Sequence, residues 1–322
     1  MNIKAEQSKA RGVFYGLAIG DALGRPLEFI PLSLIKQRYG AQGLCDLPTP
    51  ALYTDDTQMS LAIAEALVER GDADLDSLME AVAAHFIAWK NSPENNRSPG
   101  ITCMRAIGAL EAGVPWFESG IPYSKGCGSA MRVAPVGYFY QHDLGRLRSV
   151  AIATGSVTHT HRAAEAACLA AAMLVKLALD GLPPQDYLPI LEEVTADISD
   201  EFDLVLHRSA QALWFVSEEE AMCYIGEGWT GDEAVGLALY CVMRYPDDYR
   251  KAIWRAANFD GDSDSVACIT GAIMGARLGV EAIPADWIAR IEKSDYLADL
   301  ADRLAAKKLA LGSASSPVTD LL

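Results

Sequence analysis

Helical periodicity constrains this chain of 322 residues more than any other feature. Apolar residues, many of them alanine and leucine, recur three and four positions apart, which is typical of amphipathic helices, and few segments alternate as strands do. The hydrophobic fraction of 51% is ample for a core. The sequence therefore predicts a single compact all-α domain over residues 1–311. We expect helices at residues 9–20, 56–70, 75–91, 100–112, 129–139, 146–154, 161–180, 187–197, 201–216, 231–244, 247–257, 263–278 and 297–310.

Net charge and cysteine usage exclude several classes of protein. A formal charge of −16 is opposite to that of a protein that binds nucleic acid through basic patches. The seven cysteines are scattered without a C-x-x-C pair, which argues against a zinc knuckle and for reduced thiols.

Met1–Arg11 has no apolar signal core, and the longest uncharged apolar run, Ala166–Val175, is too short to cross a membrane. We expect a cytoplasmic protein without nucleic-acid or membrane partners, ending in a loose tail at Gly312–Leu322.

An acidic stretch, N-F-D-G-D-S-D-S at 258–265, precedes an apolar segment that we expect to be helical. Asp260, Asp262 and Asp264 lie two residues apart, so they cannot share one helix face and indicate a loop. The helix dipole stabilises each carboxylate by only about 1 kcal/mol, and a bound cation would stabilise converging carboxylates further. An exposed turn with solvated aspartates remains equally open. An EF-hand fits poorly because the sixth position, counted from Asp260, is Ser265 rather than glycine.

A second acidic helix start, Thr54-Asp55-Asp56-Thr57, precedes the helix expected at 56–70. One side-chain oxygen, from Thr54 or Asp55, suffices to cap a helix. The remaining carboxylate and hydroxyl oxygens are the ligands that Mg²⁺ or Mn²⁺ prefers. If the two acidic starts met, they would form an all-oxygen site for two ions, although neither motif is diagnostic alone.

The first helix carries a stripe of glycines. Gly16, Gly20 and Gly24 lie four residues apart, which leaves one face nearly bare for a ligand or a second helix. Close helix packing is the favoured interpretation for Gly16. Glu28 follows on an expected loop between apolar neighbours, and it is either a surface group or an inward-pointing acid.

Further polar loops could contact an anionic ligand. Gly126-Cys127-Gly128 precedes a helix start and offers backbone N–H groups to a phosphate, but it matches neither a Rossmann nor a Walker motif. In T-H-T-H at 158–161, we expect His159 to contact a ligand or cap a helix, and His161 to be solvated. No cysteine or third histidine lies nearby to complete a zinc site. For Arg97 we favour a solvated loop residue over a ligand contact.

Taken together, these motifs resemble the ADP-ribosylglycohydrolase family. Its members include the dinitrogen-reductase-activating glycohydrolase and the hydrolases of ADP-ribosylarginine and ADP-ribosylserine. The motifs occur in the family's order and span nearly the whole chain. They are G-x-x-x-G-D-A-L-G at 16–24 with Glu28, Y-T-D-D-T at 53–57, G-x-G-S-A-M-R at 126–132, T-H-x-H at 158–161 and D-G-D-S-D-S at 260–265.

The resemblance implies an all-α domain with two divalent cations, Mg²⁺ or Mn²⁺, in a central cleft. The metal ligands implied by the family pattern are Thr54, Asp55, Asp56, Asp262, Asp264 and Ser265, with Asp264 as the bridge between the ions. The implied proton acceptors are Asp56 and Glu28. The segment implied to hold ADP-ribose contains Ser124, Gly126, Gly128, Ser129 and His159. Asp260 receives no metal role.

The implied reaction releases ADP-ribose from a modified protein side chain. We expect ADP-ribosylarginine as the substrate, by similarity to the bacterial members. ADP-ribosylserine and O-acetyl-ADP-ribose remain alternatives, and so does an immunity-type protein that binds and blocks an ADP-ribosyltransferase. The chain departs from the family pattern at two places. Ser265 replaces the usual threonine but keeps a hydroxyl, so we expect metal ligation to survive, whereas Cys127 in place of a frequent asparagine and Lys125 in place of a residue that is aromatic in some members leave substrate preference open.

Overall fold

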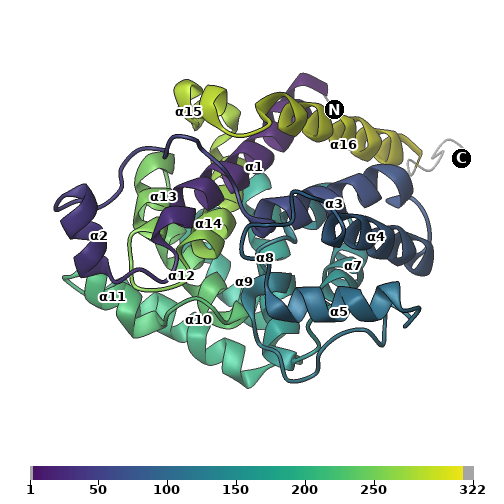
Figure 1. The fold of residues 1–322 in the computed structure, drawn as a ribbon, viewed down its shortest axis with the longest axis horizontal. Helices are drawn as coiled ribbons and strands as arrows, with labels where there is room; N and C mark the ends of the chain where they lie inside the picture. The colour runs from purple at the N-terminus through teal and green to yellow at the C-terminus, as the bar shows by residue number, and fades with distance from the viewer. Residues whose placement is uncertain (1–2, 315–322) are drawn as a thin grey trace, which may run out of the picture.

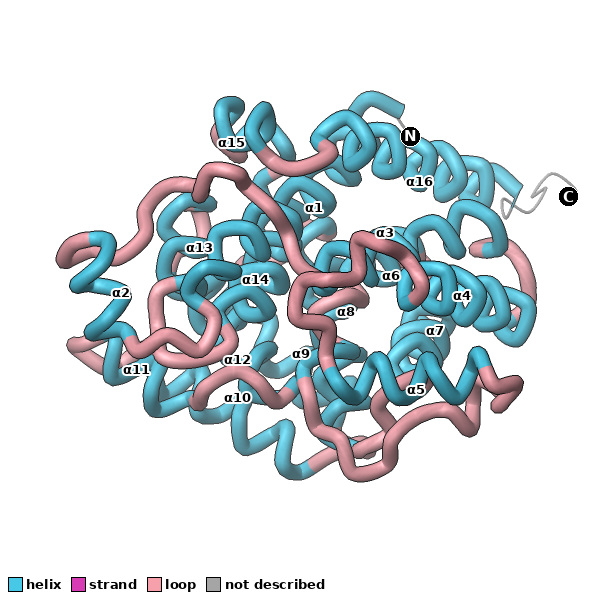
Figure 2. The backbone as a smooth tube through the Cα atoms, viewed as in Figure 1, coloured by secondary structure: helices cyan, strands magenta, loops and turns pink. Residues whose placement is uncertain are grey.

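The structure, a computed structural model, describes residues 3–314 and folds them into helices joined by loops (Figures 1 and 2). Within those residues strand-type contacts are limited to isolated bridges, so the predicted all-α fold is confirmed. The helices are α1 Ile3–Gly24, α2 Leu32–Tyr39, α3 Asp55–Arg70, α4 Leu75–Lys90, α5 Ile101–Glu111, α6 Ala134–Phe139, α7 Leu144–Ser156, α8 Arg162–Leu179, α9 Tyr187–Thr195, α10 Asp200–Ala212, α11 Glu218–Ile225, α12 Gly231–Arg244, α13 Tyr249–Ala257, α14 Ser263–Leu278, α15 Ala285–Arg290 and α16 Ser294–Ala314. Short 3₁₀ turns are η1 Arg25–Leu27, η2 Cys127–Ser129, η3 Pro184–Asp186 and η4 Val280–Ala282.

α1 and α14 form the central helix pair (Figure 1). A Cβ atom at Gly12 would lie 2.3 Å from the carbonyl oxygen of Gly275, and one at Gly24 would lie 2.3 Å from that of Ser263. These pairings make the helices antiparallel and allow their backbones to touch, which side chains would prevent. The predicted close packing at Gly16 is confirmed by the same geometry. The C-terminal end of α1 therefore meets the start of α14.

α8 and α16 enclose this pair. Nearly every residue of α8 from Ala163 to Leu179 is buried, and the helix packs against α6, α7, α12 and α14. α16 packs along α1, where Lys308 Nζ donates to Glu6 Oε2 at 3.0 Å. None of the helices within residues 3–314 combines the length and the apolar content needed to cross a bilayer.

Short helices account for most differences from the sequence prediction. α2, α11 and α15 were not predicted, because segments of eight residues or fewer contain too few turns to establish a period. The helix predicted at 129–139 begins only at Ala134, with Pro135 in its first turn, where proline is tolerated. α16 continues to Ala314, into the predicted tail, and residues 315–322 lie outside the described part of the chain.

Candidate functional site

Asp21, fully buried in α1, holds the start of α3 in place. Its carboxylate accepts hydrogen bonds from the N–H of Thr54 at 2.9 Å, the N–H of Thr57 at 3.1 Å and the hydroxyl of Thr57 at 2.6 Å. The first turn of a helix has N–H groups without intrahelical partners, which a carboxylate satisfies well. Burial nevertheless raises the pKa of Asp21 to about 6. No role was predicted for Asp21, although an ionisable residue inside an apolar helical segment is a signal for one.

The first acidic helix start is anchored by this contact. Thr54 is the N-cap of α3, and its hydroxyl accepts the N–H of Asp56 at 3.3 Å, as the capping rule predicts. Asp55 accepts the N–H of Gly100 at 3.2 Å. Asp56 is 3% exposed, and among residues 3–314 its Oδ2 atom has no hydrogen-bond partner.

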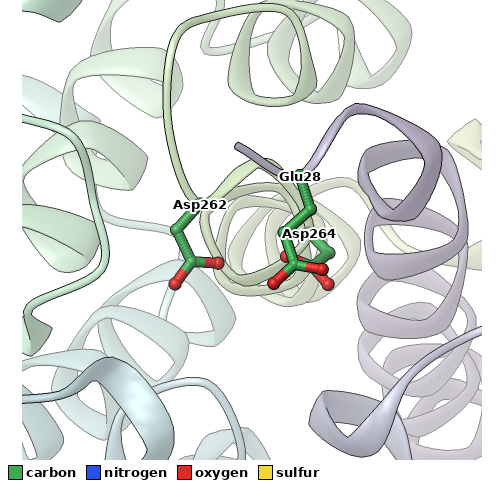
Figure 3. Close-up of side chains that lie close together, drawn as sticks. All are labelled: Glu28, Asp262 and Asp264. Carbon is green, nitrogen blue, oxygen red and sulfur yellow. The ribbon is translucent and has the colours of Figure 1, made fainter. Parts of the chain in front are cut away.

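The second acidic helix start meets Glu28. Because α1 is antiparallel to α14, the loop after α1 delivers Glu28 to Asp262 and Asp264. One carboxylate oxygen from each of the three lies within 4.8 Å of the others, and their side chains converge in Figure 3. Asp262 is the N-cap of α14, and Ser265 N–H donates to Asp264 Oδ1 at 3.0 Å. The inward-pointing interpretation of Glu28 is therefore correct.

A cleft of about 700 Å³ contains both acidic helix starts. Its wall comprises Glu28 from the loop after α1, the acidic starts of α3 and α14, the glycine-rich loop, His159 and several apolar groups. The lining residues are Glu28, Phe29, Asp55, Asp56, Ser98, Pro99, Gly100, Ile101, Thr102, Cys103, Tyr123, Ser124, Lys125, Gly126, Cys127, Gly128, Met131, His159, Trp229, Thr230, Asp262, Asp264 and Ser265. Of the predicted site residues, Thr54 and Ser129 lie behind this wall.

Mutual repulsion and burial disfavour the ionised carboxylates in the cleft. Burial, then the charges of Asp262 and Asp21, raise the pKa of Glu28 to about 7. Burial is also the main reason why the pKa of Asp55 is raised to about 7. Burial and neighbouring carboxylates raise the pKa values of Asp56 and Asp264 well above their ordinary range.

These carboxylates fit a divalent cation. A buried carboxylate oxygen without a partner, such as Asp56 Oδ2, is unfavourable unless a cation binds it. The side chains of the two acidic helix starts offer oxygen atoms, with the sulfur of Cys127 beside them, and a mainly oxygen donor set suits Mg²⁺ or Mn²⁺ better than a metal that prefers nitrogen or sulfur. The chemistry of the residues is thus compatible with the divalent metals that the family resemblance implies.

The glycine-rich loop makes room for the ring of His159. A Cβ atom at Gly126 would lie 3.2 Å from His159 Nε2, and one at Gly128 would lie 2.9 Å from Cε1. The N–H of Cys127 already donates to the carbonyl of Trp229 at 3.0 Å, so it is not available to a phosphate. A side chain at Gly128 would overlap the histidine ring and Cys103 Sγ, 2.8 Å away, and one at Gly126 would crowd the ring, so the glycines have a packing role whatever the loop binds.

Cys127 reaches the acidic cluster from this loop. Its Sγ lies 3.1 Å from Asp262 Oδ2 and 3.2 Å from Ser265 Oγ. Ser124 lines the cleft, and its hydroxyl lies 2.9 Å from that of Thr102. Ser129 is fully buried, with its hydroxyl 3.5 Å from the carbonyl of Ala164.

The contacts of three other residues can be compared with the roles predicted for them from the sequence. Arg97 is not a solvated loop residue, since it pairs with Glu292 and donates to the carbonyl of Tyr53 at 2.7 Å. His161, expected to be solvated, is the N-cap of α8, where its Nδ1 accepts the N–H of Ala163 at 3.2 Å. Asp260, given no metal role, accepts the N–H of Leu32 at 2.7 Å.

Comparisons with known proteins agree with the motifs. The chain matches the family model described as ADP-ribosylglycohydrolase over residues 2–312. ADP-ribosylarginine hydrolase Tri1 of Pseudomonas putida is 28% identical over 300 residues, covering 92% of this chain and 77% of that protein. ADP-ribosyl-[dinitrogen reductase] glycohydrolase of Rhodospirillum rubrum is 27% identical over 300 residues, covering 88% and 90%. A solved structure named ADP-ribosylglycohydrolase-related protein complex is similar with a TM-score of 0.74 at 29% identity, covering 95% of this chain and 99% of that one.

The resemblance seen in the sequence is thus confirmed by a match that spans the described domain. Both named relatives are hydrolases of ADP-ribosyl linkages. The chain belongs to the ADP-ribosylglycohydrolase family, whose enzymes hydrolyse the linkage between ADP-ribose and its acceptor.

Proposed function

We propose that this protein is a divalent-metal-dependent hydrolase that releases ADP-ribose from modified arginine side chains of proteins. The observation that carries the proposal is the convergence of two acidic helix starts and Glu28 in one cleft. Solvated acidic turns do not account for it, because these carboxylates are largely buried. The unpartnered Oδ2 of Asp56 supports a cation at this place.

The proposed metal ligands come from the two acidic motifs. Two divalent cations, Mg²⁺ or Mn²⁺, would be held by Thr54, Asp55, Asp56, Asp262, Asp264 and Ser265. When bound, such cations supply positive charge that orients ribose hydroxyls and lowers the pKa of a water molecule. Thr54 is the weakest member of this set, because its hydroxyl already caps α3 and lies outside the cleft wall.

Asp56 and Glu28 are the proposed proton acceptors. Glu28 is the more exposed of the two, and its pKa of about 7 leaves an ionised fraction near neutral pH that can accept a proton from water. Glycoside cleavage passes through an oxocarbenium-like transition state, and those carboxylates of the cleft that are ionised would stabilise its positive charge.

The ADP-ribosyl group would contact the opposite wall. Ser124, Gly126, Gly128 and His159 line the cleft there, and Ser129 supports the loop from behind. Lys125 is the only lysine or arginine among the described residues that line the cleft, so it is the cation available to the diphosphate.

Arginine is the proposed acceptor for two reasons. The guanidinium group is positively charged, which a carboxylate-rich cleft favours over the neutral oxygen of serine. The relative from Pseudomonas putida is named as an ADP-ribosylarginine hydrolase, which supports the same choice.

The function can be tested by measuring ADP-ribose released from arginine-, serine- and glutamate-linked substrates, with and without Mg²⁺. We expect release from the arginine linkage only, and its loss in excess chelator. Equal activity in chelator would contradict the metal requirement, and faster release from serine would contradict the acceptor.

Variants separate hydrolysis from simple blocking of a transferase. Asp56→Ala and Asp264→Ala should abolish release while the fold is retained, as checked by circular dichroism. Asp260→Asn, in the same acidic stretch, is the matched control and should remain active, because the Asp260 carboxylate accepts the N–H of Leu32 at the start of α2 and does not line the cleft. Protection of a transferase target by the inactive variants would point instead to a blocking protein.

A further inference from the structure

Arg132 is a fully buried cation beside the cleft. Its Nη2 donates to the carbonyl of Thr154 and to Oγ1 of Thr158, both at 2.8 Å. The guanidinium carbon lies 4.6 Å from the ring centroid of Phe86. A guanidinium group has N–H donors and no acceptor. In the contact with Arg132, the Thr158 hydroxyl must therefore be the acceptor.

The hydroxyl proton of Thr158 has two possible acceptors. His159 Nδ1 lies 2.7 Å from Oγ1, whereas the carbonyl of Gly155 lies 3.4 Å away. That carbonyl already accepts the N–H groups of both Thr158 and His159. The proton therefore goes to Nδ1, which must be unprotonated to accept it. A neutral His159 then carries its own proton on Nε2.

The surroundings keep the ring of His159 neutral and fixed. Burial, followed by the charge of Arg132, lowers the pKa of His159 to about 3. Gly126 and Gly128 flank the ring, and the N–H of Ile121 donates to the carbonyl of Thr158 at 2.9 Å. Among the described residues, no hydrogen bond is made at Nε2, and the ring forms part of the cleft wall.

We propose that Arg132 and Thr158 are positioning residues that set His159 as the Nε2–H tautomer. The cleft would then present one neutral N–H donor, fixed in direction, to an oxygen of the ADP-ribosyl group. The identity of that ligand rests on the proposed function, whereas the tautomer does not. In this arrangement His159 binds substrate and does not supply a proton to the leaving group.

The tautomer is measured on the free protein by long-range ¹H–¹⁵N correlation NMR of the five histidines. A His159→Gln variant identifies the signals of His159. We expect Nε2 to show the shift of a protonated nitrogen and Nδ1 that of an unprotonated one. The reverse pattern, or an average of the two tautomers, would overturn the proposal.

Thr158 variants test the cause. Thr158→Val keeps the shape but removes the hydroxyl, and we expect the single tautomer to be lost, while Thr158→Ser should retain it. Thr195→Val is the matched control, since it removes a fully buried hydroxyl in α9 that bonds the carbonyl of Leu191. An unchanged His159 spectrum in folded Thr158→Val would show that Thr158 does not set the tautomer. If that variant does not fold, the wild-type and Thr158→Ser spectra still show whether His159 is held as the Nε2–H tautomer and whether a hydroxyl at position 158 suffices for it.

Binding of ADP-ribose, followed by calorimetry, tests the ligand. One well-aligned hydrogen bond is worth about a fivefold to tenfold change in affinity, so Thr158→Val should bind that much more weakly. Thr158→Ser and Thr195→Val should stay within about twofold of the wild type. Equal binding by Thr158→Val would overturn the role in recognition. No binding by the wild type would instead contradict the proposed function and leave the tautomer result standing.

Discussion

The buried carboxylates at the cleft differ in whether the protein already supplies their hydrogen-bond partners. Asp21 accepts three groups at the start of α3, so its carboxylate is committed to holding that helix. Asp56, by contrast, has a buried Oδ2 without a protein partner among the described residues. Because unsatisfied buried oxygens are unfavourable, Asp56 is the residue whose environment most requires a cation.

Lys125 provides a test of how a cleft lined by carboxyl groups binds the negatively charged diphosphate of ADP-ribose. It pairs with Glu201 at the rim, where the Glu201 carboxylate raises the pKa of Lys125. Replacement by methionine in Lys125→Met should weaken ADP-ribose binding by about threefold to tenfold, because a charge-assisted contact to the diphosphate is lost. Calorimetry at low and high salt measures the effect, which should shrink as salt rises.

The control for Lys125 is Lys36→Met, which removes a comparable exposed pair with Glu219. This change should leave ADP-ribose affinity unaltered. If Lys125→Met also binds ADP-ribose as tightly as the wild type, the diphosphate does not lie at Lys125.

At the level of elements, the glycine stripe between α1 and α14 determines where the carboxylates lie. A Cβ atom at Gly20 would lie 2.0 Å from the carbonyl oxygen of Ala267, which is backbone and cannot move aside. The close contact fixes the position of Glu28, four residues beyond the last glycine of the stripe, relative to Asp264. Packing of two helices therefore shapes the site.

We predict that Gly20→Ala lowers the free energy of unfolding by about 1–3 kcal/mol, because the added methyl group overpacks the interface. Gly108→Ala in α5 is the matched control, since its nearest atom would be Lys90 Cε at 3.9 Å. That change should raise stability by about 0.5–1 kcal/mol through helix propensity. Denaturant titration of both variants decides, and equal effects would contradict the packing argument.

The contact between α3 and α4 should depend on pH. His85 of α4 lies 3.0 Å from Glu65 and 3.1 Å from Glu69, and the hydrogen bond to Glu65 is the main reason why the pKa of His85 is raised. Because the pKa of His85 is higher in the folded protein than in the unfolded chain, the protonated histidine stabilises the fold. This stabilisation is fully present below the unfolded-state pKa of about 6.5 and is lost as the pH rises through the folded-state pKa.

The stability lost in His85→Gln should therefore be larger at pH 5.5 than at pH 8.5, by about half a kcal/mol for a partly exposed pair. Denaturant titration at both pH values measures the difference. His207→Gln, which removes an exposed histidine on α10, is the control and should show a smaller change. A His85→Gln effect that grows with pH would contradict the assigned charge state.

The elements also show what the sequence could predict. Long helices such as α3 and α14 were predictable because sixteen residues hold several turns of one pattern. The convergence of their acidic starts could be hypothesised from motif order. The role of Asp21 could not, because it depends on N–H groups more than thirty residues away. The position of Ser129 behind the wall follows from tertiary packing, which local pattern does not encode.

For the molecule as a whole, the last described helix packs against the first. α16 returns to α1, where Lys308 pairs with Glu6 and Arg11 with Asp302, so α16 braces the helix that carries Asp21. The domain boundary at residue 311 stays a prediction. α16 runs past it to Ala314, so the helix itself does not mark a boundary there. The formal charge of −16 places the cleft in an acidic molecule, which favours cations over anions near it.

The most direct test of this account is calorimetric titration of Mn²⁺ into chelator-treated protein. We predict binding to the wild type and to Asp260→Asn with similar affinity, and binding at least about tenfold weaker to Asp264→Asn, because one charged oxygen ligand is lost. If the wild type takes up no Mn²⁺, or if Asp264→Asn binds it as tightly as Asp260→Asn, the two acidic helix starts do not form a metal site.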